Sequence, residues 1–314
     1  MATSNLSALH FHDPDKARKY LESQVWPNGP VCPHCGGVER NSKLEGKSHR
    51  AGLYFCGDCR EQFTVTVGTV FERSKIPLSK WLMAAYLLCS SKKGMSSHQL
   101  HRTLGITYKS AWFMTHRIRT AMAGNSNGLL GSGGGHVEVD ETYWGKTAEG
   151  KARHRKISMH DKMKVVSLVQ RGGEARSFHV HKVDHKTLHD LIAKNVSPDT
   201  HLFTDQNRLY WGAKGKTVKT HERVNHSKGE YARGHVTINT VEGYFSILKR
   251  GLIGTYHHVG EQHLIRYVKE FDFRYNNRKA LGISDAARTD AVLKGIVGKR
   301  LTYRRTASQQ ATQG

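Results

Sequence analysis

The sequence predicts a multidomain protein, with two small modules in its N-terminal part and an α/β domain after them. Three observations indicate this fold class. Four of the five cysteines form two close pairs. The stretch from Leu78 to Met122 has helical periodicity and contains no proline. Beyond a Gly-rich stretch, strand-like and helical segments alternate in an α/β pattern, and 314 residues suffice for two or three compact units.

The charge of the chain predicts a polyanionic partner. Lys and Arg number 49 against 26 Asp and Glu, which gives a formal net charge of +23. A chain this basic repels itself unless nucleic acid or an anionic membrane neutralises it. We expect no membrane partner, because no run of about 18 apolar residues is present to span one. The polar N-terminus also lacks the apolar segment of a signal peptide, so a cytoplasmic nucleic-acid partner is the expectation.

The domain boundaries are predicted from changes in composition. A short amphipathic helix begins near Asp13 and ends at Pro27-Asn28-Gly29-Pro30. Gly- and Ser-rich residues 125–135 have the composition of a flexible linker. The predicted segments are an N-terminal helical lead (1–29), a cysteine module (30–70), a helical module (71–124), the linker (125–135), the α/β domain (136–283) and a C-terminal tail (284–314), which we expect to be frayed after about residue 299.

The cysteine module has the spacing of a four-thiolate zinc site. Cys32 and Cys35 form one Cys-x-x-Cys turn, and Cys56 and Cys59 form the second after twenty intervening residues. Each turn directs two sulfurs at one tetrahedral ion, and a β-hairpin fits the gap. One structural Zn²⁺ would supply about 10 kcal/mol of folding free energy to this small module. The alternative is a redox dithiol. Basic side chains in the hairpin favour a phosphate contact over a solvated face: Lys43, Lys47, His49 and Arg50.

The helical module contains a predicted helix-turn-helix. Residues 96–104 and 108–119 form two amphipathic helices around a short turn. Gly105 permits a left-handed residue in the turn, and Thr107 is placed to cap the second helix. The alternative is a plain helical hairpin with a solvated basic face. On the helix-turn-helix interpretation, the second helix offers basic residues to a DNA groove: Lys109, His116, Arg117 and Arg119.

The segments after the linker predict a sheet with flanking helices. The order is three strands, a helix, a strand and two helices. The expected strands are 137–143, 164–170, 175–180 and 201–205, and the expected helices are 185–194, 239–250 and 261–276.

Three acidic residues of this domain are candidate metal ligands. Asp140 shares one face of the first strand with Glu138, and acidic residues in mid-strand are locally unfavourable. Asp205 closes a strand, where ligand sites collect in α/β sheets, and Glu242 lies on a later helix. Hard divalent cations take carboxylate oxygens, and two Mg²⁺ ions about 3.5–4 Å apart need several of them. The alternative is that these acids merely pair with the surplus of Lys and Arg.

The helix that carries Glu242 has two distinct stripes. Its apolar stripe is predicted to be buried and comprises Val241, Tyr244, Phe245 and Leu248. A polar stripe beside it comprises Asn239, Glu242, Ser246 and Lys249. Lys249 lies two turns from Glu242, which suits contact with a DNA phosphate.

Four segments resemble the ISXO-type group of bacterial insertion-sequence transposases, which have an N-terminal zinc ribbon and an RNase H-like DDE catalytic domain. The segments are Trp26–Gly36, Val137–Gly145, Asn239–Val259 and Phe271–Arg278. The resemblance covers nearly the whole chain. It implies hydrolytic nicking of transposon ends and attack of the freed 3′ hydroxyl on target DNA. It also implies a homodimer or higher oligomer on double-stranded DNA and a nucleoid-associated location.

The resemblance implies roles for individual residues. Asp140, Asp205 and Glu242 match the acids that hold two Mg²⁺ or Mn²⁺ ions, and Lys249 matches an associated basic residue. Asn239, one helical turn from Glu242, is the alternative third ligand. Glu138 and Glu141 are interpreted as neighbours of the true ligand. The predicted DNA-binding residues are Lys109, Arg117, Arg119, Lys249 and Arg250.

Three further features have two interpretations each. The loop between residues 145 and 164 contacts DNA or is merely solvated, and its basic residues are Lys146, Lys151, Arg153, Arg155, Lys156 and Lys162. Tyr210 and Trp211 pack in the core or stack on a flipped base. The irregularly spaced histidines suit loop capping or phosphate contacts better than a metal site: His221, His226, His235, His257 and His258.

Rival functions remain distinguishable by sequence features. A non-catalytic DNA-binding regulator derived from a transposase predicts at least one lost acid, whereas all three acids are present. A structure-specific nuclease on the same fold does not explain two binding modules ahead of the catalytic domain. A ribbon-bearing RNA-binding protein does not explain the three acids.

Overall fold

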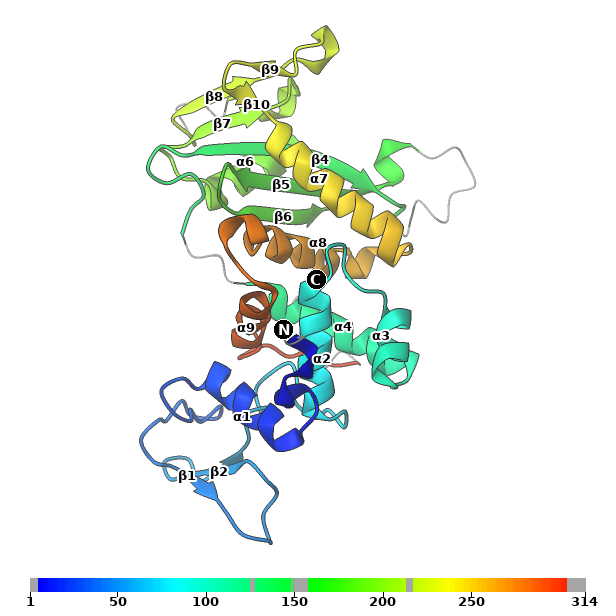
Figure 1. The fold of residues 1–314 in the computed structure, drawn as a ribbon. Coiled ribbons are helices and arrows are strands. Elements are labelled where there is room, and N and C mark those ends of the chain that lie inside the picture. Colours follow the sequence, from blue (N-terminus) through cyan, green and yellow to red (C-terminus); the bar gives the residue numbers. More distant parts are fainter. Residues whose placement is uncertain (1–4, 125–127, 148, 150–157, 213–216, 304–314) are drawn as a thin grey trace. The chain divides into compact units, whose positions relative to one another are not determined.

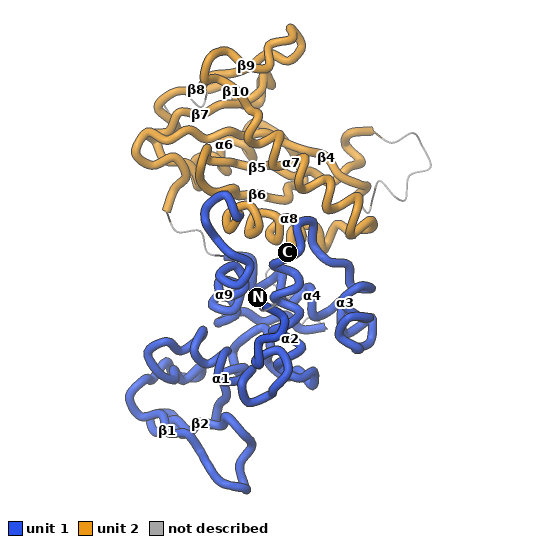
Figure 2. The backbone as a smooth tube through the Cα atoms, viewed as in Figure 1, with its two compact units in different colours: residues 1–124, 279–314 blue, residues 125–278 orange. Residues whose placement is uncertain are grey.

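The computed structural model describes residues 5–124, 128–147, 149, 158–212 and 217–303. The chain divides into two compact units (Figure 2). Unit 1 comprises residues 1–124 and 279–314, and unit 2 comprises residues 125–278. Among the described residues, no helix is long and apolar enough to cross a membrane.

A small antiparallel sheet forms the first part of unit 1. Its strand order is β1-β2-β3, with β1 at Asn41–Leu44, β2 at Leu53–Cys56 and β3 at Gln62–Phe63. Helix α1 (Pro14–Val25) precedes the sheet, and the Asp13 side chain caps it by accepting a hydrogen bond from the Lys16 N–H. A cluster of three aromatic rings, those of Trp26, Tyr54 and Phe63, supports the strands with centroids 5.3–5.7 Å apart.

Helices form the second part of unit 1. They are α2 (Leu78–Ser90), α3 (Ser97–Leu104) and α4 (Tyr108–Met122) (Figure 1). The predicted turn between α3 and α4 is confirmed in its local geometry. Gly105 has a φ of 59°, which glycine adopts without steric cost, and the Thr107 side chain accepts a hydrogen bond from the Ser110 N–H.

The segment predicted as a C-terminal tail contains a folded helix. Helix α9 (Asp285–Lys294) is capped by Ser284 and packs against α2. Its Leu293 is fully buried, and the Arg288 guanidinium donates a hydrogen bond of 2.7 Å to the Cys89 carbonyl oxygen. The prediction of a tail from residue 284 was therefore wrong, because a few apolar positions in a polar segment suffice when a partner surface covers them. Residues 304–314 lie outside the described residues.

A mixed five-stranded sheet organises unit 2. The strand order is β6-β5-β4-β7-β8. β4 and β6 both pair antiparallel with β5, whereas β7 is parallel to β4 and to β8. This arrangement is consistent with the RNase H-like fold that the resemblance implies, and β8 was not predicted. The strands are β4 (His136–Trp144), β5 (Met163–Gln170), β6 (Ala175–Val180), β7 (His201–Thr204) and β8 (Thr220–Arg223).

Helices and two hydrophobic clusters cover the two faces of this sheet. Helix α6 (His185–Asn195) packs its Leu188 and Ile192 with Val137 and Val139 on one face. Helices α7 (Asn239–Gly251) and α8 (Glu261–Asn276) cover the other face (Figure 1). Because side chains alternate along β4, Glu138 and Asp140 belong to the face covered by α7. The predicted buried stripe of α7 is confirmed in full: Val241, Tyr244, Phe245 and Leu248.

Short elements complete the described chain. A hairpin of β9 and β10 precedes α7, and a π-helix, η6, extends α7. Gly251 at this junction lies so close to the Phe271 ring that a Cβ would clash with it at 2.1 Å. The bounds are β9 (Ala232–Arg233), β10 (Val236–Thr237) and η6 (Leu252–Tyr256), with 3-10 turns η1 (Asn5–Ser7), η2 (Leu9–Phe11), η3 (Met159–Asp161), η4 (Arg208–Tyr210), η5 (His226–Lys228) and η7 (Lys279–Leu281).

The described part of the predicted linker is an ordered turn of unit 2. The N–H groups of Gly133 and Gly134 donate to an Asp199 carboxylate oxygen, at 2.6 and 3.0 Å. The Gly131 N–H donates to the Gln170 side chain, and Leu130 forms a β-bridge with Val196. Glycines are abundant here because several residues of this turn have positive φ angles, which glycine adopts without steric cost. Their abundance therefore does not indicate flexibility. Unit 2 thus begins before the predicted residue 136 and ends at 278 instead of 283.

Candidate functional site

The four paired cysteines converge on one point in unit 1. The sulfurs of Cys32 and Cys59 lie 3.6 Å apart, as do those of Cys35 and Cys56, and all four lie within 4.8 Å of one another. Four thiolates around a zinc ion with Zn–S bonds of about 2.3 Å would be about 3.8 Å apart. The backbone N–H groups of Cys59 and Asp58 lower the pKa of the Cys56 thiol to about 7, which favours its thiolate form. In the same cluster the Glu61 N–H lowers the pKa of Cys59, but burial and the neighbouring thiols outweigh it and raise that pKa to about 12. The donor set fits one structural Zn²⁺.

The sheet register of unit 2 brings two of the predicted acids together. His136 pairs with His201 and Glu138 with Phe203 in the parallel ladder between β4 and β7. The same register, continued by two residues, places Asp205 level with Asp140. Both residues fall on the α7 face, because side chains two positions apart share a face. Asp205 directly follows β7, as the sequence predicted for a strand end.

The acids act on one another electrostatically. Burial raises the pKa of Asp140 to about 8, and the negative charges of Glu141, Asp205 and Glu242 add to that rise. Burial also raises the pKa of Asp205, against the lowering effect of the Asn207 N–H and of His226. Among the described residues, only the four cysteines bring three or more ligand atoms within 4.8 Å of one another. The carboxylates therefore share one electrostatic environment, but their oxygens lie further apart than the ligands of a single bound ion.

Three residues that the sequence did not assign to the acid site contact two of its acids, Glu141 and Glu242. Glu141 accepts hydrogen bonds from the Asn207 amide at 3.1 Å and from the Tyr210 hydroxyl, and so ties β4 to the loop after Asp205. The His226 imidazole lies 3.7 Å from a Glu242 oxygen and also within reach of the Asp205 charge. His226 was one of several irregularly spaced histidines, and only the fold places it between two acids.

Glu138 anchors the helix that carries Glu242. Its side chain is fully buried and accepts hydrogen bonds of 2.9 Å from the Thr240 hydroxyl and from the Val241 N–H in the first turn of α7. The Arg171 guanidinium pairs with the same carboxylate at 2.7 Å and donates to the carbonyl oxygens of His235 and Thr237. These contacts occupy Glu138, which agrees with its interpretation as a neighbour of the ligand. They also orient α7 relative to β4.

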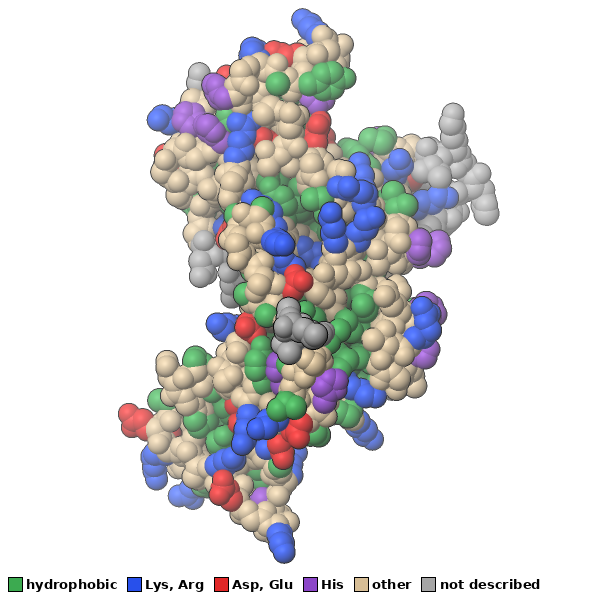
Figure 3. Space-filling view, viewed as in Figure 1, with side chains coloured by type: hydrophobic (Ala, Val, Ile, Leu, Met, Phe, Trp, Pro, Cys, Tyr) green, Lys and Arg blue, Asp and Glu red, His purple; other side chains and the backbone are tan. Residues whose placement is uncertain are grey.

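The exposed face of α7 is basic. Glu242 and Lys249 are exposed, as the polar stripe predicted, and Arg250 is exposed beside them. Lys and Arg side chains gather over the C-terminal half of this helix (Figure 3). Asn239 is exposed at the start of the same helix. A basic surface that begins two turns from an acid cluster is suited to hold a phosphate backbone near that cluster.

Two predicted DNA-binding residues are buried, and that part of the prediction was wrong. Arg117 is 6% exposed and donates a hydrogen bond to the Glu72 carbonyl oxygen at 2.6 Å. Arg119 is 1% exposed and donates to the Thr115 hydroxyl. His116, on the same predicted face, is also buried. The reason lies in elements distant in sequence. Helices α2 and α9 pack against α4 and cover the face that its sequence periodicity predicted to be exposed. Lys109 remains exposed at the start of α4.

The structure gives the burial of some of the residues for which the sequence allowed two interpretations. Tyr210 is fully buried, whereas Trp211 is 47% exposed. Lys146 and Lys162 of the basic loop are partly buried, and its other basic residues, Lys151, Arg153, Arg155 and Lys156, lie outside the described residues.

Comparisons with known proteins match two segments of the chain to transposase domains. Residues 132–276 match the ISXO2-like transposase domain, and residues 13–62 match the transposase zinc-ribbon domain. A Halobacterium salinarum protein, described as an uncharacterized protein in transposable element ISH50, is 29% identical over 273 residues, covering 82% of this chain and 90% of that protein. An uncharacterized transposase-like protein of Haemophilus influenzae is 32% identical over 98 residues, covering 31% of this chain and 77% of that protein.

The matched segments coincide with the two sites. The zinc-ribbon match contains all four paired cysteines, and the transposase-domain match contains Asp140, Asp205 and Glu242. Helices α3 and α4 lie outside both matches. Two segments of the chain are thus similar to parts of insertion-sequence transposases, one to their zinc ribbon and the other to the ISXO2-like transposase domain.

Proposed function

We propose that this protein binds the terminal inverted repeats of an insertion sequence, nicks the ends by Mg²⁺-dependent hydrolysis and joins the freed 3′ hydroxyl to target DNA. The observation that carries the proposal is the ladder register that sets Asp205 level with Asp140, with the charge of Glu242 felt at the same point. Burial and the neighbouring carboxylate charges raise the proton affinity of Asp140 in the absence of a cation, and a carboxylate in such surroundings is a suitable ligand for divalent metal.

Different side chains of this unit would bind the metal ions, position the ligands and bind the DNA backbone. The carboxylates of Asp140, Asp205 and Glu242 would hold the ions. Bound Mg²⁺ or Mn²⁺ supplies activation of the attacking oxygen and stabilisation of the leaving oxygen. Glu141 holds the loop after Asp205, and the Glu138–Arg171 pair holds the start of α7. Lys249 and Arg250 on the exposed face of α7 bind the phosphate backbone, which aligns the scissile bond with the acids.

End recognition is assigned to unit 1. Helices α3 and α4 would act as the helix-turn-helix, with the exposed N-terminal residues of α4, Tyr108 and Lys109, directed to a DNA groove. Exposed Arg102 on α3 would contact the backbone. The zinc ribbon adds further phosphate contacts. Because two ends must be joined to one target, we propose a dimer or higher oligomer on nucleoid DNA.

The test is cleavage of a labelled duplex that carries the element's own end, in Mg²⁺, Mn²⁺ or EDTA. We expect metal-dependent nicking that is lost in Asp140→Asn, Asp205→Asn and Glu242→Gln, while duplex binding is retained. Asp190→Asn, which removes an exposed acid of α6, is the matched control and should cleave normally. Binding without cleavage in either metal would contradict the proposal and indicate a regulator. Loss of activity in Asn239→Ala with survival in Glu242→Gln would transfer the third ligand to Asn239.

A further inference from the structure

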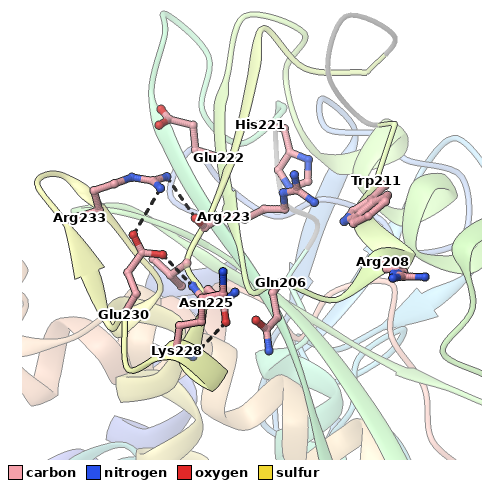
Figure 4. Close-up of a pocket in the computed structure, with 11 residues that line it drawn as sticks. Gln206, Arg208, Trp211, His221, Glu222, Arg223, Asn225, Lys228, Glu230 and Arg233 are labelled. Carbon is pink, nitrogen blue, oxygen red and sulfur yellow. Dashed lines mark hydrogen bonds and ion pairs between the residues drawn. The ribbon is translucent and has the colours of Figure 1, made fainter.

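A large polar cavity lies beside the acid site and has no part in the proposed metal chemistry. Its volume is about 760 Å³, within the range of cavities that hold ligands of roughly nucleotide size. It begins at Gln206, the residue after Asp205, and continues through η4 and β8 to the β9 hairpin (Figure 4). Because Gln206 in the cavity wall directly follows the proposed metal ligand Asp205, a DNA strand held at the acids would reach this cavity with its neighbouring nucleotides.

An exposed tryptophan forms one wall of this cavity. Trp211 is 47% exposed, although the adjacent Tyr210 is fully buried and serves the core. The guanidinium groups of Arg223 and Arg208 lie 4.9 and 5.4 Å from the centroid of its indole ring. Figure 4 shows Arg223 extending from β8 toward Trp211, with Arg208 nearby. A half-exposed indole flanked by arginines is a surface on which a planar base stacks.

The charges of the cavity are unbalanced. Of its two acids, Glu230 pairs with Arg233 at 3.3 Å, and Glu222 lies 3.7 Å from His235, outside the lining. Within the described part of the chain, no carboxylate pairs with Arg208, Arg223 or Lys228. Three such cations around one cavity favour an anionic occupant with several phosphates in a row.

We propose that this cavity binds an unpaired nucleotide of a DNA strand, whose base stacks on Trp211 while adjoining phosphates pair with Arg208, Arg223 and Lys228. The inference rests on the proposed function, because it takes DNA as the substrate. A base inside a duplex keeps both faces stacked on its neighbours, so only an unpaired base can offer a face to the indole. The base would replace a guanidinium over the ring, and the displaced arginine would gain a phosphate. Stacking tolerates any base, so the site holds a strand without reading its sequence.

The first test measures binding of a fluorescently labelled oligothymidylate to the full chain by anisotropy, in EDTA. We expect Trp211→Ala to weaken binding about fivefold to a hundredfold, the range found when stacked aromatic side chains are removed, and Trp211→Phe to restore most of it. Leu129→Ala, which shortens a 42% exposed apolar side chain of the same unit, is the matched control and should leave binding unchanged. Binding of the blunt element-end duplex should be equal in all four proteins.

The second test measures how binding of the same oligonucleotide depends on salt. We expect Arg208→Gln and Arg223→Gln each to reduce the slope of log affinity against log salt by about 0.7, the value for one phosphate contact on a single strand. Lys194→Gln removes an exposed charge of α6 and should leave the slope unchanged.

The outcomes separate this inference from the proposed function. Because binding is measured in EDTA, a protein without metal-dependent cleavage still reports on the cavity. Absence of oligothymidylate binding, or Trp211→Ala binding as tightly as the parent, overturns the inference. Weakening in the arginine variants alone also overturns it, because it indicates a phosphate site without base stacking.

Discussion

At the scale of single residues, two acids on the same face of β4 differ in their hydrogen-bond partners and in the charges near them. Glu138 is fully buried but is matched by three donors, namely Arg171, the Thr240 hydroxyl and the Val241 N–H. Asp140 lies two residues further along β4, and burial, with the charges of neighbouring carboxylates, raises its pKa to about 8. Glu138 therefore stabilises the fold, whereas the ionised form of Asp140 destabilises it.

The raised pKa of Asp140 predicts a pH dependence of stability without metal. Its folded-state pKa of about 8 exceeds the ordinary value of 3.8, so the folded state binds the extra proton between these values. Stability contributed by that proton is lost as the pH rises through about 8. In EDTA at pH 8.5, Asp140→Asn should therefore have a higher melting temperature than the parent protein, by about 2–4 °C for each kcal/mol of unfolding free energy gained. Near pH 4 the two melting temperatures should be equal. Thermal scans at both pH values measure this, and an equal gap at the two pH values would contradict it.

The buried Glu138–Arg171 pair predicts a loss of stability. Glu138→Gln leaves a partly buried guanidinium without its counter-charge and weakens the anchor of α7. We expect the free energy of unfolding to fall by about 2–3 kcal/mol, which urea titration measures. Glu174→Gln is the matched control, since the half-exposed Glu174 pairs with Arg176 at 3.2 Å and should cost about 1 kcal/mol or less. Equal losses in the two variants would show that the anchor has no special role.

At the scale of elements, local pattern predicted some features well and others poorly. The cysteine spacing, the Thr107 cap and the buried stripe of α7 depend on neighbours within a few residues, and the structure confirms each of them. The exposed face of α4 depends on α2 and α9, which are distant in sequence. Periodicity marks a helix as amphipathic, but it does not say how many partners cover that helix.

The four-cysteine site predicts that the stability of the zinc ribbon depends on one Zn²⁺ ion. We expect one zinc per chain in the purified protein, and loss of that zinc together with the β1–β3 sheet in Cys56→Ser. Cys89→Ala is the control, because Cys89 is buried in α2 far along the chain from the other cysteines and should not alter metal content. Elemental analysis gives the zinc content, and limited proteolysis of residues 30–70 reports the local unfolding. A full zinc complement in Cys56→Ser would exclude the four-thiolate site.

At the scale of the whole molecule, unit 1 is built from two segments that are distant in sequence. Residues 279–314 return to unit 1, so the α/β unit is inserted into it. Besides Leu293, α9 buries Val292, and the Lys299 ammonium donates to the Ala121 carbonyl oxygen at 3.1 Å. Unit 1 is thus incomplete until the last part of the chain is present.

This closure predicts that unit 1 depends on its C-terminal helix. Leu293→Ala should lower the free energy of unfolding by about 2–5 kcal/mol, the range for a buried leucine that leaves a cavity. Val297→Ala, at a position 54% exposed, should change it by about 0.5 kcal/mol or less. Chemical denaturation monitored by hydrogen exchange in α2 and α4 distinguishes the two. An unaffected α2 in Leu293→Ala would mean that α9 is only an appendage.

The sequence by itself determined what depends on near neighbours. These features are the thiolate spacing, the Thr107 cap, the buried stripe of α7 and, apart from β8 and the hairpin of β9 and β10, the order of elements from β4 to α8. Only the tertiary structure decided that Arg117 and Arg119 are buried, that residues 128–135 form an ordered turn, and that Glu138 anchors α7. The physical reason is that burial and hydrogen bonding are properties of pairs of segments. Which segments pair is set by packing across the whole chain, and no local pattern records it.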